Sequence, residues 1–376
     1  MEEEIKTVVV IDNGSNTIKA GFAGDDAPRK IFPSVVGYTK KSPINLAMDE
    51  KNYFVGDEAK ERRGRLEMKN PFHDSLINDW ADVENLWNYT FFNALKVCPE
   101  EVYAVITESP MNPKKYRERT METLFELFSL EGVYLASKSL LSLYSTGKTT
   151  GCVIDSGKGV TYSVPIYEGY CSPHEMISLN IGGRHLDEKL NKILFEKGYE
   201  FTTPLELELL SEIKEKLCCV TTQRKNNPTK DPVFENEYKT YNLPDDSVVR
   251  LSFERQSIPE IMFNPRLIEI EEPGIHQICF KSIMKTNTEI RPEMFANIIL
   301  AGGNTLFDGM RKRLHEEIVD VAPVKTKVEV CNNPERLYSS WIGGSIIGNM
   351  DTFQYLCISR EEYDESGGKV VNDKIF

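Results

Sequence analysis

Two short apolar runs that each end in an aspartate give the clearest pattern along this chain. The first covers residues 8–11 and ends at Asp12, and the small polar residues 13–15 lead to a second apolar segment over residues 18–22. A run of four apolar, mostly β-branched residues predicts a buried strand. The stretch therefore predicts a two-stranded hairpin whose first strand ends in a carboxylate.

The same pattern returns in the second half of the chain. Residues 152–154 are apolar, Asp155 follows, and residues 156–160 are rich in glycine. The backbone N–H groups of such a turn suit phosphate oxygens, and a carboxylate at a strand end can hold a hydrated divalent cation. A single copy is also an ordinary hairpin turn. Two copies in matching context favour a nucleotide held between two lobes.

Hydrophobic periodicity predicts the elements around these hairpins. The expected helices cover residues 82–94, 114–128, 138–145, 204–217 and 307–318, and the expected strands cover 31–37, 102–106 and 297–301, with a strand pair over 241–253. Thr203 and Glu206 form a capping box, with Pro204 at the first helical position. The order of strands and helices restarts after residue 150, so we expect an α/β fold with a duplicated architecture.

Two surface features and one glycine pair complete the pattern. Residues 38–52 read as a surface loop whose tip carries Ile44, Leu46 and Met48, and an exposed apolar tip favours a partner contact. Residues 221–240 are a second polar excursion. Gly302 and Gly303 follow the strand at 297–301 and would let a flat ring approach the backbone. The alternative for the glycine pair is a plain tight turn.

Composition narrows the classes of function. The 376 residues suggest about two to three domains, and a net charge of −13 argues against nonspecific binding to nucleic acid or anionic membranes. The acidic start at residues 1–4 is unlike a secretory signal, and no apolar run approaches the length of a membrane span. Eight scattered cysteines fit reduced cytosolic thiols.

Several motifs spread along the chain closely resemble those of the actin family. They are residues 12–15, 19–28, 55–59, 169–170, 213–218, 341–345 and 362–367. The resemblance covers the whole chain with almost no insertions. It implies an actin-like two-lobed α/β ATPase fold, in which duplicated mixed-sheet domains flanked by helices hold ATP (or ADP) and Mg²⁺, with Ca²⁺ as an alternative, in the cleft between the lobes.

The resemblance also implies a domain organisation and partners. Residues 1–33, 71–145 and 338–376 would form the first large subdomain, 34–70 a small subdomain with the inter-subunit loop, 146–181 and 271–337 the second large subdomain, and 182–270 the second small one. A cytoplasmic cytoskeletal protein is implied, with the nucleus as a second location. It would assemble with itself or with other actin-family subunits and bind actin-binding proteins at the cleft between the large subdomains.

Carried over position by position, the resemblance assigns a nucleotide site. The first phosphate loop would consist of Gly14, Ser15, Asn16, Thr17 and Lys19, and the second of Gly157, Lys158, Gly159 and Val160. Ribose and adenine would be enclosed by Gly183, Lys214, Glu215, Gly302, Gly303, Leu306, Phe307 and Leu337, and metal-bound waters would be oriented by Asp12 and Asp155. Leu337 stands where the family has a lysine that packs on adenine.

Three departures from the family pattern concern hydrolysis. Lys138 replaces the glutamine that orients the attacking water, Lys158 replaces an aspartate, and Tyr162 replaces a histidine. A carboxamide both donates to and accepts from water, whereas an ammonium only donates. Lys138 could therefore neutralise the terminal phosphate, and partly replace the divalent cation, without aligning a nucleophile. The alternative is that both lysines have drifted, with side chains in solvent.

Other departures concern phosphate exit and assembly. Asn16 replaces a glycine of the first loop, and Ser178 replaces an arginine on the phosphate exit route. Residues 266–272, in the position of the hydrophobic plug, carry carboxylates that would resist burial in a filament axis. Together they indicate a divergent actin or an actin-related protein.

Three functions follow as hypotheses. The first is a nucleotide-gated structural protein that hydrolyses ATP slowly or not at all, and the second is a conventional, hydrolysing, filament-forming actin. The third, a sugar kinase or chaperone ATPase of the same fold, lacks an assignable sugar pocket or a peptide-binding domain, and fold alone does not fix function.

Overall fold

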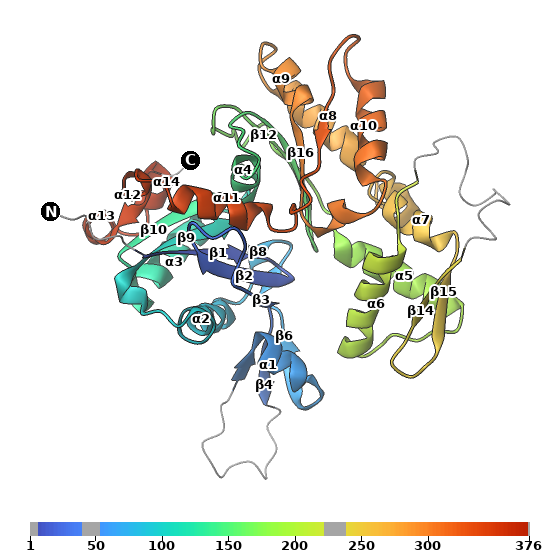
Figure 1. Cartoon of the computed structure of the whole chain (residues 1–376), viewed down its shortest axis with the longest axis horizontal. Coiled ribbons are helices and arrows are strands. Elements are labelled where there is room, and N and C mark those ends of the chain that lie inside the picture. Colours follow the sequence, from blue (N-terminus) through green and yellow to red (C-terminus); the bar gives the residue numbers. More distant parts are fainter. Residues whose placement is uncertain (1–6, 40–52, 222–237, 375–376) are drawn as a thin grey trace. The chain divides into compact units, whose positions relative to one another are not determined.

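A computed structural model of the chain describes residues 7–39, 53–221 and 238–374 (Figure 1). These form two compact units: residues 1–149, 168–173 and 338–376 belong to unit 1, and residues 150–167 and 174–337 belong to unit 2. Each unit contains a mixed sheet with helices, so the expected α/β class is confirmed. The finer division into four subdomains stays a prediction.

Unit 1 is built on a six-stranded sheet that contains the first predicted hairpin. The strand order is β18-β10-β9-β1-β2-β3, with β1 (Thr7–Asn13), β2 (Thr17–Phe22), β3 (Lys30–Pro33), β9 (Val102–Glu108), β10 (Gly132–Ser137) and β18 (Ile358–Ser359). Strands β1, β9 and β10 are parallel, whereas β2 runs antiparallel to β1. The carboxyl ends of three neighbouring strands therefore meet at one edge.

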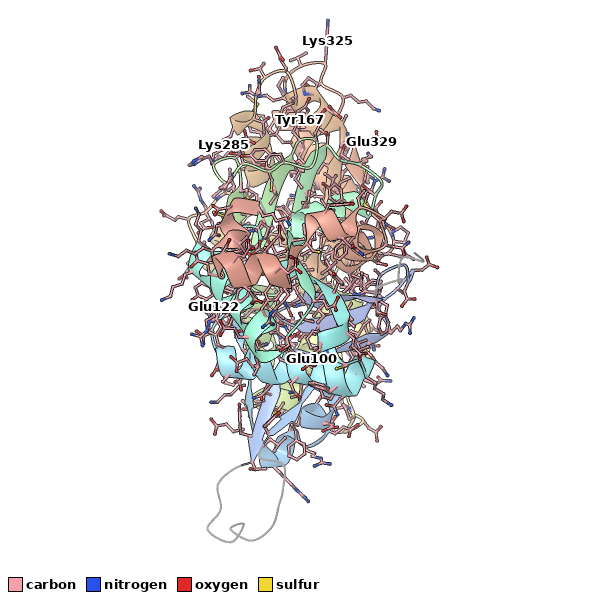
Figure 2. The ribbon with its side chains drawn as sticks, turned by 90° about the vertical axis from the view of Figure 1, so that its left-hand side faces the viewer. Glu100, Glu122, Tyr167, Lys285, Lys325 and Glu329 are labelled. Carbon is pink, nitrogen blue, oxygen red and sulfur yellow. The ribbon has the colours of Figure 1, made fainter. Side chains whose placement is uncertain are left out.

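The central strands of this sheet are apolar on both faces because each face is covered. Val9, Ile11 and Ile106 pack into a core with Trp87, while Val10 packs with Trp341 in a second cluster. This explains the continuous apolar run of the first strand, as expected for parallel strands buried on both sides. Acidic side chains such as those of Glu100 and Glu122 project outward from unit 1 (Figure 2).

The helices of unit 1 include two that change type partway along. The α-helices are α1 (Gly56–Glu61), α2 (Trp80–Asn88), α3 (Lys114–Glu122), α4 (Lys138–Tyr144), α11 (Ser339–Gly348), α12 (Phe353–Leu356), α13 (Arg360–Ser366) and α14 (Val370–Lys374); η1 (Arg63–Arg65) and η3 (Pro99–Glu101) are 3₁₀ turns, and η2 (Tyr89–Leu95) and η4 (Thr123–Leu127) are π-helical. The predicted α-helices over 82–94 and 114–128 thus end early. Near each change a threonine hydroxyl donates to the carbonyl four residues back (Thr90 to Leu86, Thr120 to Tyr116), a contact that bends helices.

The predicted strand over residues 31–37 is confirmed in part, because the chain breaks at residues 34–35 and continues as a strand of a different sheet. Strand β3 pairs with β2, whereas β4 (Val36–Thr39) pairs with β5 (Tyr53–Val55) and β6 (Leu66–Lys69) in a small sheet. At the break, the backbone N–H and the hydroxyl of Ser34 donate to the carbonyls of Asn16 and Gly14. A short hairpin, β7 (Phe72–His73) and β8 (Leu76–Ile77), follows. Most of the expected 38–52 loop, including its apolar tip, lies outside the described residues.

Unit 2 is built on a five-stranded sheet that contains the second predicted hairpin. The order is β13-β12-β11-β16-β17, with β11 (Gly151–Ser156), β12 (Thr161–Ile166), β13 (Ile177–Leu179), β16 (Ile298–Ala301) and β17 (Val330–Cys331). Strands β11 and β16 are parallel, so Asp155 lies beside Ala301 at their carboxyl ends. The predicted strand pair over 241–253 is also confirmed, as β14 (Lys239–Asn242) and β15 (Val248–Leu251).

The helices of unit 2 confirm one predicted start and correct another. They are α5 (Gly183–Glu196), α6 (Pro204–Leu217), α7 (Glu254–Glu260), α8 (Ile275–Lys285), α9 (Arg291–Ala296) and α10 (Met310–Val321), with 3₁₀ turns η5 (Pro265–Ile268) and η6 (Gly303–Leu306). The capping box of Thr203 and Glu206 is present in full. The helix expected from residue 307 begins at Met310, because Gly309 takes a left-handed conformation with φ +84°. Most of the 221–240 excursion lies outside the described residues.

Glycine is required where α11 packs on α4 in unit 1. A Cβ added at Gly343 would lie 1.8 Å from the carbonyl oxygen of Leu141, and one added at Gly344 would lie 2.8 Å from Val10 Cγ1 of the sheet. Beside them the Trp341 indole donates to the carbonyl of Val10 at 3.1 Å. The close approach of α11 thus depends on residues without side chains.

We expect Gly343→Ala to lower the free energy of unfolding by about 1–3 kcal/mol or more, because the added methyl forces the two helices apart. Urea unfolding followed by tryptophan fluorescence measures the loss. The matched control is Gly64→Ala, where a Cβ meets nothing within 4 Å. Equal stability of the two variants would contradict this account of α11.

Candidate functional site

The first turn is organised by the buried carboxylate of Asp12 at the end of β1. Because β1 and β9 are parallel and in register at Ile11 and Ile106, their carboxyl ends bring Thr107 beside Asp12. The Thr107 hydroxyl donates to Asp12 Oδ1 at 2.8 Å and accepts from the Asn13 backbone N–H at 3.0 Å. Asp12 is only 2% exposed, so its charge must be balanced by protein groups.

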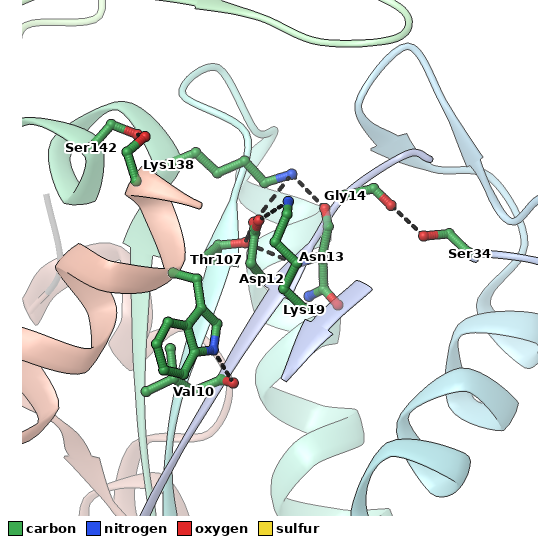
Figure 3. A network of polar contacts seen from close by, with 11 residues as sticks. Val10, Asp12, Asn13, Gly14, Lys19, Ser34, Thr107, Lys138 and Ser142 are labelled. Atoms are coloured by element: carbon green, nitrogen blue, oxygen red, sulfur yellow. Dashed lines mark hydrogen bonds and ion pairs between the residues drawn. The ribbon is translucent and has the colours of Figure 1, made fainter. Parts of the chain in front are cut away.

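Two lysines supply that balance (Figure 3). Lys19 lies opposite Asp12 across the hairpin, and its Nζ is 2.8 Å from Asp12 Oδ2. Lys138, the first residue of α4, donates from Nζ to the carbonyl of Asn13 and lies 3.9 Å from Asp12 Oδ1. The Lys138 side chain is only 15% exposed. It is therefore directed onto the first turn, and the alternative that it points into solvent is wrong.

The electrostatics of Asp12 follow from these contacts. Burial alone would raise its pKa, but the charges of Lys19 and Lys138, with hydrogen bonds from Lys19 and Thr107, outweigh burial and hold the pKa of this carboxyl well below its usual range. Asp12 is thus ionised across the whole physiological range. A buried cluster of one carboxylate and two ammonium groups carries a formal charge of +1.

The backbone of the first turn is held from several sides. The Gly14 N–H donates to the carbonyl of Asp12 at 3.0 Å, and a Cβ at Gly14 would lie 2.3 Å from the carbonyl oxygen of Thr17. The Asn70 side chain donates to the carbonyl of Ser15 at 2.8 Å, and the Trp87 indole donates to the Asn13 side chain at 3.1 Å. The turn is thus preorganised, with Asn16 on its exposed side.

The second turn, at residues 157–160, is clamped onto the start of α5. The Gly157 N–H donates to the carbonyl of Val160, while the Gly157 carbonyl accepts from the Gly183 N–H at 3.0 Å and from the Asn304 side chain at 2.6 Å. A Cβ at Gly182 would lie 2.6 Å from the carbonyl oxygen of Lys158. The predicted residues 157–160 and Gly183 are therefore brought together.

A second lysine pair lies beside this turn. Lys214 is 4% exposed, its Nζ is 2.8 Å from Asp187 Oδ1, and it donates to the carbonyl of Gly183 at 3.2 Å. Lys158 keeps contact with solvent. Its pKa is lowered because the surrounding protein partly desolvates the ammonium and the Lys214 charge repels it, although the Asp187 carboxylate opposes both effects.

Asp155 shares the end of its strand with a glycine and with two of the altered positions. Gly302 adopts φ +83°, and a Cβ there would lie 2.6 Å from Asp155 Oδ1. Tyr162 is the cross-strand neighbour of Asp155, and Ser178 is the next neighbour of Tyr162. Tyr162 is 7% exposed. Asp155 itself is half-buried, unlike Asp12.

The residues predicted to enclose the adenosine divide into two groups. Gly303 lies near Leu337, whose Cδ1 is 3.8 Å from a Cβ built on that glycine, and Leu306 and Leu337 are both exposed, at 39% and 37%. Glu215 is also exposed. Phe307 instead packs into the hydrophobic core of unit 2. The two exposed leucines provide apolar surface close to the Gly303 backbone, whereas Phe307 is buried in the core.

Sequence reasoning missed three residues that position these turns: Thr107, Asn304 and Asp187. Thr107 had a usable signal, since it is a polar residue directly after the predicted buried strand over residues 102–106. Asn304 directly follows the glycine pair, and no pattern in the sequence sets it apart from that turn. Asp187 lies on α5, a helix that the hydrophobic pattern did not reveal.

We expect Asp12→Asn to lower the free energy of unfolding by about 3–5 kcal/mol at neutral pH, because it leaves two buried ammonium groups without their counter-charge. The native pKa of Asp12 is depressed, so its stabilising effect is present above the unfolded pKa of about 4 and is lost as the pH falls further. The difference between wild type and variant should therefore shrink in acid. Urea midpoints at several pH values measure it.

The matched control for this substitution is Asp25→Asn, which removes an aspartate whose Arg29 partner is largely exposed. It should leave the urea midpoint nearly unchanged. A gap between Asp12→Asn and wild type that stays constant down to strongly acidic pH would contradict the ionised, lysine-paired state of Asp12.

A comparison with known protein families finds a match over nearly the whole chain. The family model described as Actin matches residues 3–376. In the described residues, no helix is long and apolar enough to cross a membrane, and no group of three or more His, Cys, Asp or Glu side chains is arranged to hold a metal ion. The match covers essentially the entire sequence, so the chain belongs to the actin family and is an actin-like nucleotide-binding protein.

Proposed function

We propose that this actin-family protein binds ATP mainly as a conformational ligand and hydrolyses it slowly or not at all. The observation that carries the proposal is the position of Lys138, whose ammonium donates to the carbonyl of Asn13 beside Asp12. An attacking water must lose its proton toward an acceptor as it is aligned. An ammonium offers hydrogen-bond donors only, so it supplies charge without that alignment.

The residues that would hold the nucleotide come from both units, and those that would hold its phosphates lie on the two turns. In unit 1, Gly14, Ser15, Asn16, Thr17 and Lys19 would hold phosphate oxygens. In unit 2, Gly157, Lys158, Gly159 and Val160 would hold phosphate, while Gly183, Lys214, Glu215, Gly302, Gly303, Leu306, Phe307 and Leu337 would enclose the nucleoside. The tight packing at Gly14, Gly182 and Gly302 supports this assignment, because an added Cβ would lie within 2.6 Å of another protein atom and the backbone beside each turn is therefore held in place.

The fit of the two aspartates to a divalent cation differs. A bound Mg²⁺ or Ca²⁺ would neutralise phosphate charge. Half-buried Asp155 keeps solvent contact and suits a metal-bound water. Asp12 is buried, and its two oxygens already accept from Thr107 and Lys19. The assignment of Asp12 to the metal stays a prediction that these surroundings do not favour.

Other altered side chains support slow turnover. Tyr162 stands beside Asp155 where the family has a histidine, and Ser178 neighbours it where the family has an arginine on the phosphate exit route. Each change removes a basic side chain, and the two positions are direct neighbours on adjacent strands β12 and β13. A phenol and an aliphatic hydroxyl cannot provide the positive charge that draws phosphate along such a route.

The wider role that we propose is participation in filaments or in an actin-related complex of the cytoskeleton. Its partners would be other copies, other actin-family subunits, or actin-binding proteins at the cleft between the large subdomains. In the segment 266–272, Glu269 takes a left-handed conformation and Glu272 accepts from the Asn180 N–H at 3.3 Å. Carboxylates at this position argue against the same filament contact as in conventional actins.

We expect purified protein to carry ATP rather than ADP, and Lys138→Gln to speed phosphate release about tenfold or more by restoring a donor and an acceptor for water. Chromatography of the extracted nucleotide and a continuous phosphate assay across a protein concentration series measure the two effects. The assay is read together with sedimentation, which reports assembly.

The control is Lys115→Gln, which removes an equivalent charge from an exposed position on α3 and should leave phosphate release unchanged. Fast phosphate release by the wild type that rises with assembly, and no gain in Lys138→Gln, would favour the conventional, ATP-hydrolysing filament-forming actin instead.

A further inference from the structure

We propose that Lys138 supplies at the first turn the positive charge that a divalent cation would otherwise provide, so that this protein binds ATP without requiring Mg²⁺ or Ca²⁺. The inference concerns the same nucleotide site and rests on the proposed function. It goes beyond slow hydrolysis, because it states whether the protein binds ATP as the free anion or as a metal complex.

The first step is that the ammonium of Lys138 has a fixed place. Lys138 begins α4 directly after β10, which is parallel to β9 and ends at the same edge of the sheet as β1. Its Nζ donates to the carbonyl of Asn13, one residue before Gly14. With only 15% of the side chain exposed, the charge is held at the turn and is partly desolvated.

The second step is that Asp12 is not available to a hydrated cation. Lys19 Nζ is 2.8 Å from Oδ2, the Thr107 hydroxyl is 2.8 Å from Oδ1, and the residue is 2% exposed. At 2% exposure, Asp12 leaves little room for a metal-bound water beside these partners. Direct binding of the carboxylate to Mg²⁺ would also be costly, because Mg²⁺ gives up its own water ligands reluctantly.

The third step is the sign of the local charge. One carboxylate and two ammonium groups leave a formal +1 within a few ångströms of the turn. Such a cluster attracts phosphate oxygens and repels a divalent cation, and partial burial strengthens both effects. An uncomplexed nucleoside triphosphate carries more negative charge than its metal complex. The cluster therefore favours the metal-free nucleotide.

The neighbouring charges in unit 1 do not reverse this conclusion. Another acid at this strand edge is Glu108, which follows Thr107 at the end of β9. It is occupied by Arg117, at 3.0 Å, and by the Asn112 side chain, at 2.9 Å. Its charge is thus compensated by its own partners, and it does not offer a second carboxylate to a cation at the turn.

The test is equilibrium dialysis of the full-length protein with ATP, once with Mg²⁺ and once with EDTA. We expect the wild-type Kd for ATP to differ by less than about threefold between the two conditions. In EDTA, the Kd of Lys138→Gln for ATP should be about tenfold or more higher than in Mg²⁺. Lys138→Arg keeps the charge and should keep binding in EDTA. Lys115→Gln is the control for removal of an exposed lysine.

A second readout does not depend on catalysis or on nucleotide release. Electron paramagnetic resonance of Mn²⁺ measures how tightly the ATP-loaded protein retains the metal. Lys138→Gln should hold Mn²⁺ about tenfold more tightly than the wild type, because the competing ammonium is gone. Circular dichroism confirms that each variant is folded before it is compared.

The outcomes separate this inference from the proposed function. ATP binding by the wild type in Mg²⁺ but not in EDTA, or Mn²⁺ retention equal to that of Lys138→Gln, overturns the inference and leaves slow hydrolysis standing. Failure of the wild type to bind ATP under either condition overturns the proposed function as well. Binding in EDTA that is lost in Lys138→Gln and kept in Lys138→Arg supports the inference.

Discussion

The first turn depends on one buried carboxylate that must be neutralised where it stands. Asp12 ends a strand covered on both faces, so it cannot reach bulk water, and Lys19, Thr107 and Lys138 surround it instead. Leaving such a charge unpaired would cost several kcal/mol. The ionic cluster therefore links the hairpin, β9 and α4 in addition to the sheet pairing, and it sets the charge that a ligand meets.

The second turn uses hydrogen bonds and close backbone packing in place of a buried ion cluster. Asn304 and the start of α5 hold the carbonyl of Gly157, and a Cβ added at Gly182 or Gly302 would clash with the backbone of residues 156–159. Two lysines, Lys158 and Lys214, also lie at this turn, but the Asp187 carboxylate neutralises the charge of Lys214. The two turns thus differ in electrostatics, because Lys138 adds a second ammonium beside the Asp12–Lys19 pair of the first turn.

Much of this could be predicted from the sequence, because hairpins, capping boxes and buried strands leave local patterns. Both aspartate turns and the α6 capping box are examples. The break at Ser34 could not be predicted, since it results from hydrogen bonds to a turn some twenty residues earlier. The direction of the Lys138 side chain could not be predicted either, because the sequence allows it to lie on the first turn or in solvent. It lies on the turn because β1, β9 and β10 are parallel and so place the start of α4 beside the turn.

The most direct test of this account is a crystal structure of the ATP-bound protein grown with Mg²⁺ at high resolution. It should place the Lys138 ammonium within hydrogen-bond distance of both the Asn13 carbonyl and a phosphate oxygen, with Asp12 still paired to Lys19. A Lys138 side chain turned into solvent, with a hydrated cation held by Asp12 in its place, would contradict the central claim.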